Sequence, residues 1–214
     1  MKLVLATFNA DKARELTALL DLPGVEIVTL EGFAGARPPE ETGATLEENA
    51  TIKAEAALRL TGLPAIADDT GLEVDALDGA PGVHAARFAG PGASYADNVR
   101  LLLARLEGVP LEARTARFRT VCVAVFPRGL GLAGEGVLEG RITLSTRGTL
   151  GFGYDPVFEP LGSDRTLAEL APAEKNAGSH RARAVRALAA RFRSLDPSEW
   201  SADPPAPGKR EGGG

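Results

Sequence analysis

The stretch FRTVCVAVF, from Phe118 to Phe126, restricts the possible folds more than any other part of this chain. It is nearly all apolar and rich in valine, which is typical of a central strand in a sheet covered on both faces. A second stretch typical of a strand, LGLAGEGVLEG, follows at 130–140. Because strand–helix–strand order precedes these two successive strands, we predict an α/β fold with a mixed sheet.

Hydrophobic periodicity predicts the remaining elements. Further strands are expected at 2–7, 23–30, 64–69 and 72–77, with a turn at Thr70–Gly71 separating the last two. Helices are expected at 9–20, 45–60, 95–106 and 182–195. Since no repeat or linker interrupts the pattern, we predict one elongated domain over residues 1–200, its sheet flanked by helices. A flexible tail rich in proline and glycine would follow at 201–214.

Composition excludes several classes of protein. The chain has 214 residues, a net charge of −5 and a single cysteine, Cys122. One cysteine permits no internal disulfide and favours a reducing compartment, and its valine neighbours favour a core residue over a nucleophile. The acidic balance argues against a nucleic-acid partner. No stretch approaches the roughly 18 apolar residues of a membrane span, so we expect a cytoplasmic protein without a membrane partner.

Two adjacent carboxylates, Asp68 and Asp69, follow the apolar residues of LPAIADDTG. Placing both at the end of a buried strand costs free energy unless a cation or hydrogen-bond donors compensate. Oxygen ligands without a histidine or cysteine cluster indicate Mg²⁺. Because successive strand residues point to opposite faces, we expect only one of the two to meet a ligand directly. The alternative is a polar turn in which Asp69 caps its own backbone.

A possible phosphate site lies where the first strand gives way to a helix. Thr7, Asn9 and Lys12 of LATFNADK place a hydroxyl, an amide and an ammonium beside a helix start, which favours anions. The alternative is an ordinary helix capped by Asn9 or Asp11, with a surface lysine. Lys53, on the next predicted helix, offers a second cation, although it also fits a solvated helix face.

A possible base site is indicated by GTLGFGYDPVFEP and EKNAGSHRARA. Phe152 and Tyr154 can stack on a base, and Asp155 can accept a hydrogen bond from a ring N–H. Ser179 is the expected cap of the last helix, which places His180 and Arg181 in its first turn. Arginine opposes the helix dipole there, so a ligand carbonyl or phosphate is its expected partner. The alternative is a basic helix face.

Together these stretches resemble the inosine/xanthosine triphosphate pyrophosphatases over about residues 2–195. The shared motifs are TFNADK, EETGATLEENATIKA, ADDTGLEVDALDGAPGVHAARFAG, GFGYDPVF and EKNAGSHRARA, of which the third and GFGYDP are highly specific. The resemblance implies a homodimer. Each chain would have two lobes with a central cleft between them. The resemblance further implies Mg²⁺-dependent hydrolysis of inosine, deoxyinosine and xanthosine triphosphates to the monophosphate and pyrophosphate.

The resemblance also implies residue roles. Asp69 would be the catalytic base and a metal ligand, and Glu40 the second metal ligand. The implied substrate-binding residues are Thr7, Asn9, Lys12, Lys53, Thr70, Phe152, Gly153, Tyr154, Asp155, Lys175, His180 and Arg181. One residue departs from the family pattern: Phe8 stands where a glycine or polar residue is frequent. A side chain of this size puts the phosphate loop's geometry in question if it points outward.

Two alternative functions remain open at this point. The chain could be a pyrophosphatase for pyrimidine or modified nucleoside triphosphates, which rates on a nucleotide panel would reveal. It could instead be a non-catalytic nucleotide sensor, which would bind nucleotides without Mg²⁺-dependent release of pyrophosphate.

Overall fold

The computed structural model describes residues 1–22 and 24–195, so the predicted tail lies outside the described residues. Its strands are β1 (Lys2–Leu5), β2 (Glu26–Thr29), β3 (Ala65–Val74), β4 (Pro81–Gly82), β5 (Thr115–Val125), β6 (Gly131–Ile142) and β7 (Phe158–Pro160). Its α-helices are α1 (Ala10–Leu19), α2 (Leu46–Thr61), α3 (Tyr95–Arg105), α4 (Pro172–Gly178) and α5 (His180–Arg193). The predicted mixed α/β fold is therefore confirmed.

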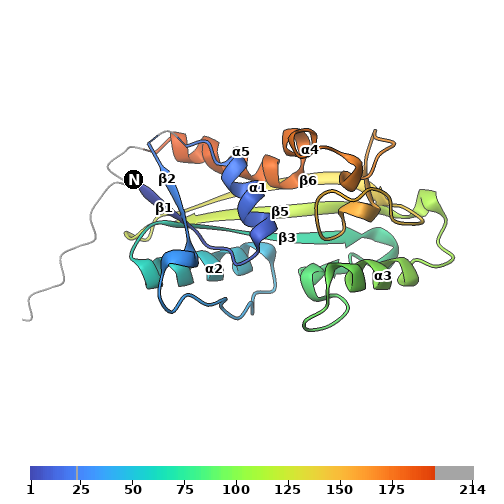
Figure 1. Ribbon diagram of the computed structural model, residues 1–214, viewed down its shortest axis with the longest axis horizontal. Helices are drawn as coiled ribbons and strands as arrows, with labels where there is room; N and C mark the ends of the chain where they lie inside the picture. Colours follow the sequence, from blue (N-terminus) through green and yellow to red (C-terminus); the bar gives the residue numbers. More distant parts are fainter. Residues whose placement is uncertain (23, 196–214) are drawn as a thin grey trace, which may run out of the picture.

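A single mixed sheet runs through the molecule in the order β2-β1-β3-β5-β6-β7, with β4 paired to β3. β1 pairs in parallel with β2 and β3, and the remaining pairs are antiparallel. The long strands β3, β5 and β6 extend along the molecule (Figure 1). The strand predicted from Phe118 to Phe126 is central, because β5 lies between β3 and β6.

At the end of the sheet that contains β1 and β2, helices cover both faces (Figure 1). On one face, α1 and α5 pack over Leu5, Ile66 and Cys122. On the other face, α2 packs over Ala65, Ala67 and neighbouring valines. A third apolar cluster lies at the opposite end of the long strands and includes residues of α3 and of the segment after β6. Cys122 is a fully buried core residue, as its apolar flanks predict.

Glycines allow α5 to lie close to β6. A Cβ added at Gly136 would overlap the backbone carbonyl oxygen of His180, and one at Gly134 would overlap the backbone of Ala184 and Leu188. The close approach fixes the first turn of α5 against the sheet. Ser179 caps this helix by accepting a hydrogen bond from the Ala182 N–H at 3.2 Å, as predicted.

The expected turn at Thr70–Gly71 is wrong, since β3 continues without a break from Ala65 to Val74. Gly71 has no positive φ and serves a different purpose from a turn glycine. A Cβ at this position would lie 2.9 Å from the carbonyl oxygen of Gly82 in β4. Gly71 therefore permits the close approach of β4, and the acid pair lies within a strand rather than at its end.

None of the described helices has the length and apolar character needed to cross a membrane.

Candidate active site

The acid pair lies beside a gap in the sheet. On one edge of β3, the pairing with β1 reaches only Ala65 and Ile66, and the pairing with β4 starts at Leu72. Within the described residues, the β3 segment 67–71 consequently has no strand partner on that edge, although β5 pairs with it on the other. Side chains from both faces of the sheet can therefore border one space.

A cavity of about 280 Å³ occupies this region, and every predicted site residue except Glu40 lines it. Lys12, Asp69 and Arg181 thus share one hollow despite their separation along the chain. Further lining residues include Phe8, Leu30, Arg37, Glu41, Tyr95 and Phe118. Phe8 is 48% exposed and therefore points outward at the cavity wall.

Asp68 is held by cations on the face covered by α1 and α5. Its Oδ2 lies 3.3 Å from Lys12 Nζ and accepts from Arg181 Nε at 3.2 Å. Burial alone would raise the pKa of this carboxyl, but the charges of Lys12 and Arg181 outweigh burial and lower it. Asp68 does not line the cavity, so the pair is divided as strand alternation predicts.

Asp69 faces the α2 side and has a different environment. Its Oδ1 accepts from Lys53 Nζ at 2.7 Å, and among the described residues its buried Oδ2 has no hydrogen-bond partner. Burial raises the pKa of Asp69 despite the nearby Lys53 and Lys12. A cavity-lining carboxylate with a raised pKa and one unused oxygen is suited to accept a proton.

Glu40 is exposed and lies outside the cavity lining, whereas its neighbour Glu41 reaches the cavity. Glu41 Oε1 lies 3.1 Å from Lys53 Nζ, so it stands beside the same lysine as Asp69. The prolines at 38 and 39 are compatible with either glutamate pointing inward, so the sequence pattern does not distinguish them. Across residues 1–22 and 24–195, no cluster of three or more His, Cys, Asp or Glu side chains forms a metal site.

The start of α1 forms the part of the cavity predicted to hold phosphates. Asn9 caps α1, and its Oδ1 accepts from the N–H groups of Asp11 and Lys12 at 3.0 and 3.1 Å. Its amide nitrogen donates to the Tyr95 hydroxyl at 2.7 Å. Burial lowers the pKa of Lys12 even though Asp68 is close. The lysines at 12 and 53 therefore bring two cations to one end of the cavity.

Phe152, from the glycine-rich segment after β6, and Tyr95, from α3, form an aromatic wall of the cavity. The rings of Phe152 and Tyr95 are tilted, with centroids 5.8 Å apart, and Lys175 Nζ lies 4.9 Å from the Phe152 centroid. Tyr154 donates its hydroxyl to the Ala85 carbonyl, so its polar group serves the fold. Asp155 Oδ2 accepts from Lys175 and from the Phe152 N–H at 2.5 and 2.8 Å. The Asp155 carboxylate thereby holds the backbone that carries Phe152 in place.

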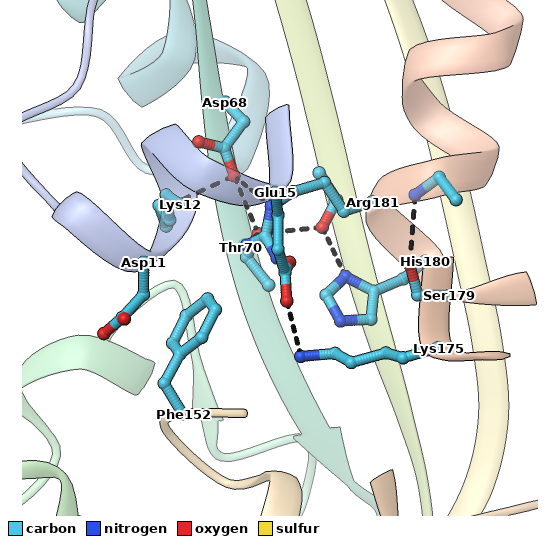
Figure 2. A network of polar contacts seen from close by, with 12 residues as sticks. Asp11, Lys12, Glu15, Asp68, Thr70, Phe152, Lys175, Ser179, His180 and Arg181 are labelled. Carbon is cyan, nitrogen blue, oxygen red and sulfur yellow. Dashed lines mark hydrogen bonds and ion pairs between the residues drawn. The ribbon is translucent and has the colours of Figure 1, made fainter. Parts of the chain in front are cut away.

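Glu15 is a site residue that sequence reasoning missed (Figure 2). From α1 it forms ion pairs with Arg181 and, at 2.7 Å, with Lys175. The carboxylates of Glu15 and Asp68 therefore accept from part of the Arg181 guanidinium, and a ligand partner for its other N–H groups stays a prediction. A signal was available, because Glu15 follows Lys12 by three positions and so shares its helix face. Three of the five guanidinium N–H groups of Arg181 are used within the protein.

The fold and cavity thus define a mixed α/β protein in which Asp69, Glu41 and two lysines line one end of a cavity and an aromatic wall lines the other. A model of the Ham1 family matches residues 3–191, and the chain belongs to this family. The resemblance predicted from the motifs is confirmed by the relatives.

Several curated relatives carry the name dITP/XTP pyrophosphatase, and two of them serve as examples. The Methylococcus capsulatus protein is 54% identical over 198 residues, covering 91% of this chain and 97% of the relative. The Symbiobacterium thermophilum protein is 53% identical over 196 residues, covering 91% and 96%. Among solved structures, a HAM1 protein from Coxiella burnetii superposes with a TM-score of 0.82 at 40% identity, covering 91% of this chain and 100% of that one.

Proposed function

We propose that this chain hydrolyses non-standard purine nucleoside triphosphates, namely inosine, deoxyinosine and xanthosine triphosphates, to the monophosphate and pyrophosphate. The observation that carries the proposal is Asp69, which lines the same cavity as Lys12, Lys53 and the aromatic wall and has a buried oxygen without a hydrogen-bond partner among the described residues. The curated names of the relatives support the same activity. The enzyme class is accordingly a nucleoside triphosphate pyrophosphatase.

In this mechanism Lys12 and Lys53 bind the triphosphate and oppose the charge that repels an incoming water. Asp69 accepts the proton of that water as the water oxygen attacks phosphorus. The bond between the α- and β-phosphates breaks, and its electrons go to the leaving phosphate oxygen. Lys53 holds Oδ1 of Asp69, which leaves Oδ2 for the proton. General-base catalysis of this kind contributes about 10²–10⁴ in rate.

Mg²⁺ fits the donors present. Asp69 and a carboxylate from Glu40 or Glu41 would be the protein ligands of the ion. Asp69 Oδ2 has no partner in the part of the chain that the structure describes and carries two lone pairs, so one could face the ion and the other the proton. Two carboxylates and substrate phosphates are a common ligand set for this ion, which needs no larger protein cluster. When bound, Mg²⁺ supplies positive charge that neutralises the phosphates.

Selectivity for the base of the nucleotide would arise at the end of the cavity opposite the two lysines. Phe152 and Tyr95 offer faces for stacking, and Arg181 retains N–H groups that can donate to the 6-oxo group of hypoxanthine or xanthine. Adenine presents an amino donor at that position, which leaves a protein donor unpaired at a cost of about 1–3 kcal/mol.

The proposal is tested by pyrophosphate release from a nucleotide panel, with Mg²⁺ present or chelated. Release from inosine and xanthosine triphosphates far faster than from adenosine, deoxyuridine or thymidine triphosphates is the expected result. Faster release from the pyrimidines would indicate the alternative substrate class, and tight binding without any release would indicate a sensor.

Family membership further leads us to propose a homodimer of the two-lobed domain predicted over residues 1–200. Light scattering on the purified protein checks this assembly, and a mass of one chain would contradict it. The cytoplasmic setting stays a prediction.

A further inference from the structure

Thr120 is a buried residue outside every family motif, and through Thr70 it connects Asp68 to His180. It lies on β5 opposite Thr70 of β3 and has no exposed surface. Its hydroxyl oxygen lies 2.8 Å from Thr70 Oγ1 and 2.6 Å from His180 Nδ1. Thr70 Oγ1 in turn lies 3.2 Å from Asp68 Oδ2, which completes a chain of four polar groups.

The hydrogen positions in this chain follow from what each group can do. The Thr70 hydroxyl accepts from Arg181, which has only donors, and it donates to the carboxylate of Asp68. Its single hydrogen is then used, so the hydrogen between Thr70 and Thr120 must come from Thr120. Thr120 can consequently offer His180 only a lone pair, and Nδ1 of His180 must carry a hydrogen.

The reverse order of hydrogens is unfavourable. It would leave the Thr70 hydroxyl oxygen and the Asp68 carboxylate facing each other with no hydrogen between them, in surroundings where unpaired polar contacts are costly. The order given above instead directs each O–H along the chain toward the negative charge of Asp68.

The other nitrogen of His180, Nε2, is available to a ligand. The imidazole lines the cavity and stacks on Phe118 with ring centroids 4.5 Å apart. No hydrogen-bond partner of Nε2 exists among the described residues. Burial, together with the charges of Arg181 and Lys175, lowers the pKa of His180 well below its usual value. The ring is therefore neutral, and Nε2 is an acceptor.

We propose that Thr120 is a positioning residue that fixes the hydrogen of His180 on Nδ1, so that Nε2 accepts a hydrogen bond from a base carrying a ring N–H. The inference rests on the proposed function, because it concerns the base of that substrate. Hypoxanthine and xanthine carry a hydrogen on N1, whereas adenine has a lone pair there. Two lone pairs would face each other in the adenine complex, which disfavours it.

The tautomer of His180 can be measured directly, because the chain has two histidines and the other one, His84, can be replaced. His84 is exposed and does not line the cavity, so His84→Gln leaves His180 as the only imidazole with a background expected to fold and function normally. Long-range ¹H–¹⁵N spectra of this variant should show the hydrogen on Nδ1. In Thr120→Val, which replaces the hydroxyl by a methyl group, the cross-peak pattern of the Nδ1–H form should be lost. In Thr120→Ser, which keeps the hydroxyl, this pattern should remain. A hydrogen on Nε2 in the His84→Gln protein, or an unchanged pattern in Thr120→Val, would overturn the proposal.

Kinetics provide the second readout. Thr120→Val should reduce the preference for inosine over adenosine triphosphate, measured as the ratio of kcat/KM values, by about tenfold. Thr120→Ser should restore the preference. An unchanged ratio in Thr120→Val would overturn the role in base recognition. A chain that hydrolyses none of these nucleotides would refute the proposed function alone, since the spectra would still decide the tautomer.

Discussion

Two neighbouring aspartates acquire different properties because strand geometry sends them to opposite faces. Asp68 meets Lys12 and Arg181, which lower its pKa, whereas burial raises the pKa of Asp69. Pairs of acids whose pKa values are driven apart are typical of sites that divide roles between them. Asp68 holds Lys12 and Arg181, whereas Asp69 is the residue for which we propose proton transfer.

The raised pKa of Asp69 predicts the pH dependence of the reaction. A general base acts only when ionised, so the rate rises with pH through the pKa of the base. Because burial raises that pKa, the acidic limb of kcat/KM should lie above the usual aspartate value of about 3.9. Initial rates on inosine triphosphate between about pH 3 and 8 measure this limb at Mg²⁺ concentrations well below saturation, because a cation bound at the carboxylate would itself lower the pKa. A limb at or below the usual value would contradict the assignment.

Glu15 should matter to stability far more than an ordinary surface acid. Glu15→Gln removes the charge that pairs with two buried cations, and we expect the free energy of unfolding to fall by about 3 kcal/mol. Glu55→Gln is the matched control, since Glu55 forms an exposed pair with Arg59 and should change stability by less than about 1 kcal/mol. Urea unfolding measures both, and equal effects would show that the Glu15 network adds nothing.

At the scale of elements, local patterns predicted most helices and strands but misplaced the acid pair. The Asn9 and Ser179 caps and the apolar run of β5 are local signals, and each forms as expected. Thr70–Gly71 resembles a turn only locally, because the reason for Gly71 is the backbone of Gly82 in another strand. The same limit hid Thr120 and the two partners of Glu15, because these contacts join residues that are distant in sequence.

The packing of α5 on β6 should be sensitive to a single methyl group. Gly136→Ala places a Cβ against the His180 backbone, which must shift the turn that carries His180 and Arg181. We expect a loss of about 1–3 kcal/mol in stability and a clear fall in kcat/KM. Gly32→Ala, at a position with open space around it, should be nearly neutral. Thermal unfolding and activity of the two variants decide the point, and a Gly136→Ala protein that behaves like Gly32→Ala would contradict it.

At the scale of the whole molecule, the cavity exists because β1 ends at Leu5 while β3 continues to Val74. The gap lies between apolar clusters at the two ends of the long strands, so segments from the whole described chain can contribute to it. Family motifs predicted which residues would meet there. The topology that brings them together depends on strand pairing between distant segments, which local sequence patterns do not contain.

Ligand binding should therefore stabilise the entire domain. A ligand that binds only the folded chain adds about 2.7 kcal/mol at a concentration one hundred times its Kd. In Asp69→Asn, for which we expect slow turnover, inosine triphosphate with Mg²⁺ should raise Tm more than adenosine triphosphate does. Differential scanning fluorimetry measures the shifts, and equal shifts for the two nucleotides would place base recognition outside this cavity.

The central claim is that the unused oxygen of Asp69 accepts the proton during hydrolysis. The most direct test compares pyrophosphate release from inosine triphosphate by the wild-type chain and by Asp69→Asn, with circular dichroism to check the fold. The account predicts an intact fold and a turnover at least about a hundredfold lower in the variant. Wild-type turnover in a folded Asp69→Asn protein would contradict it.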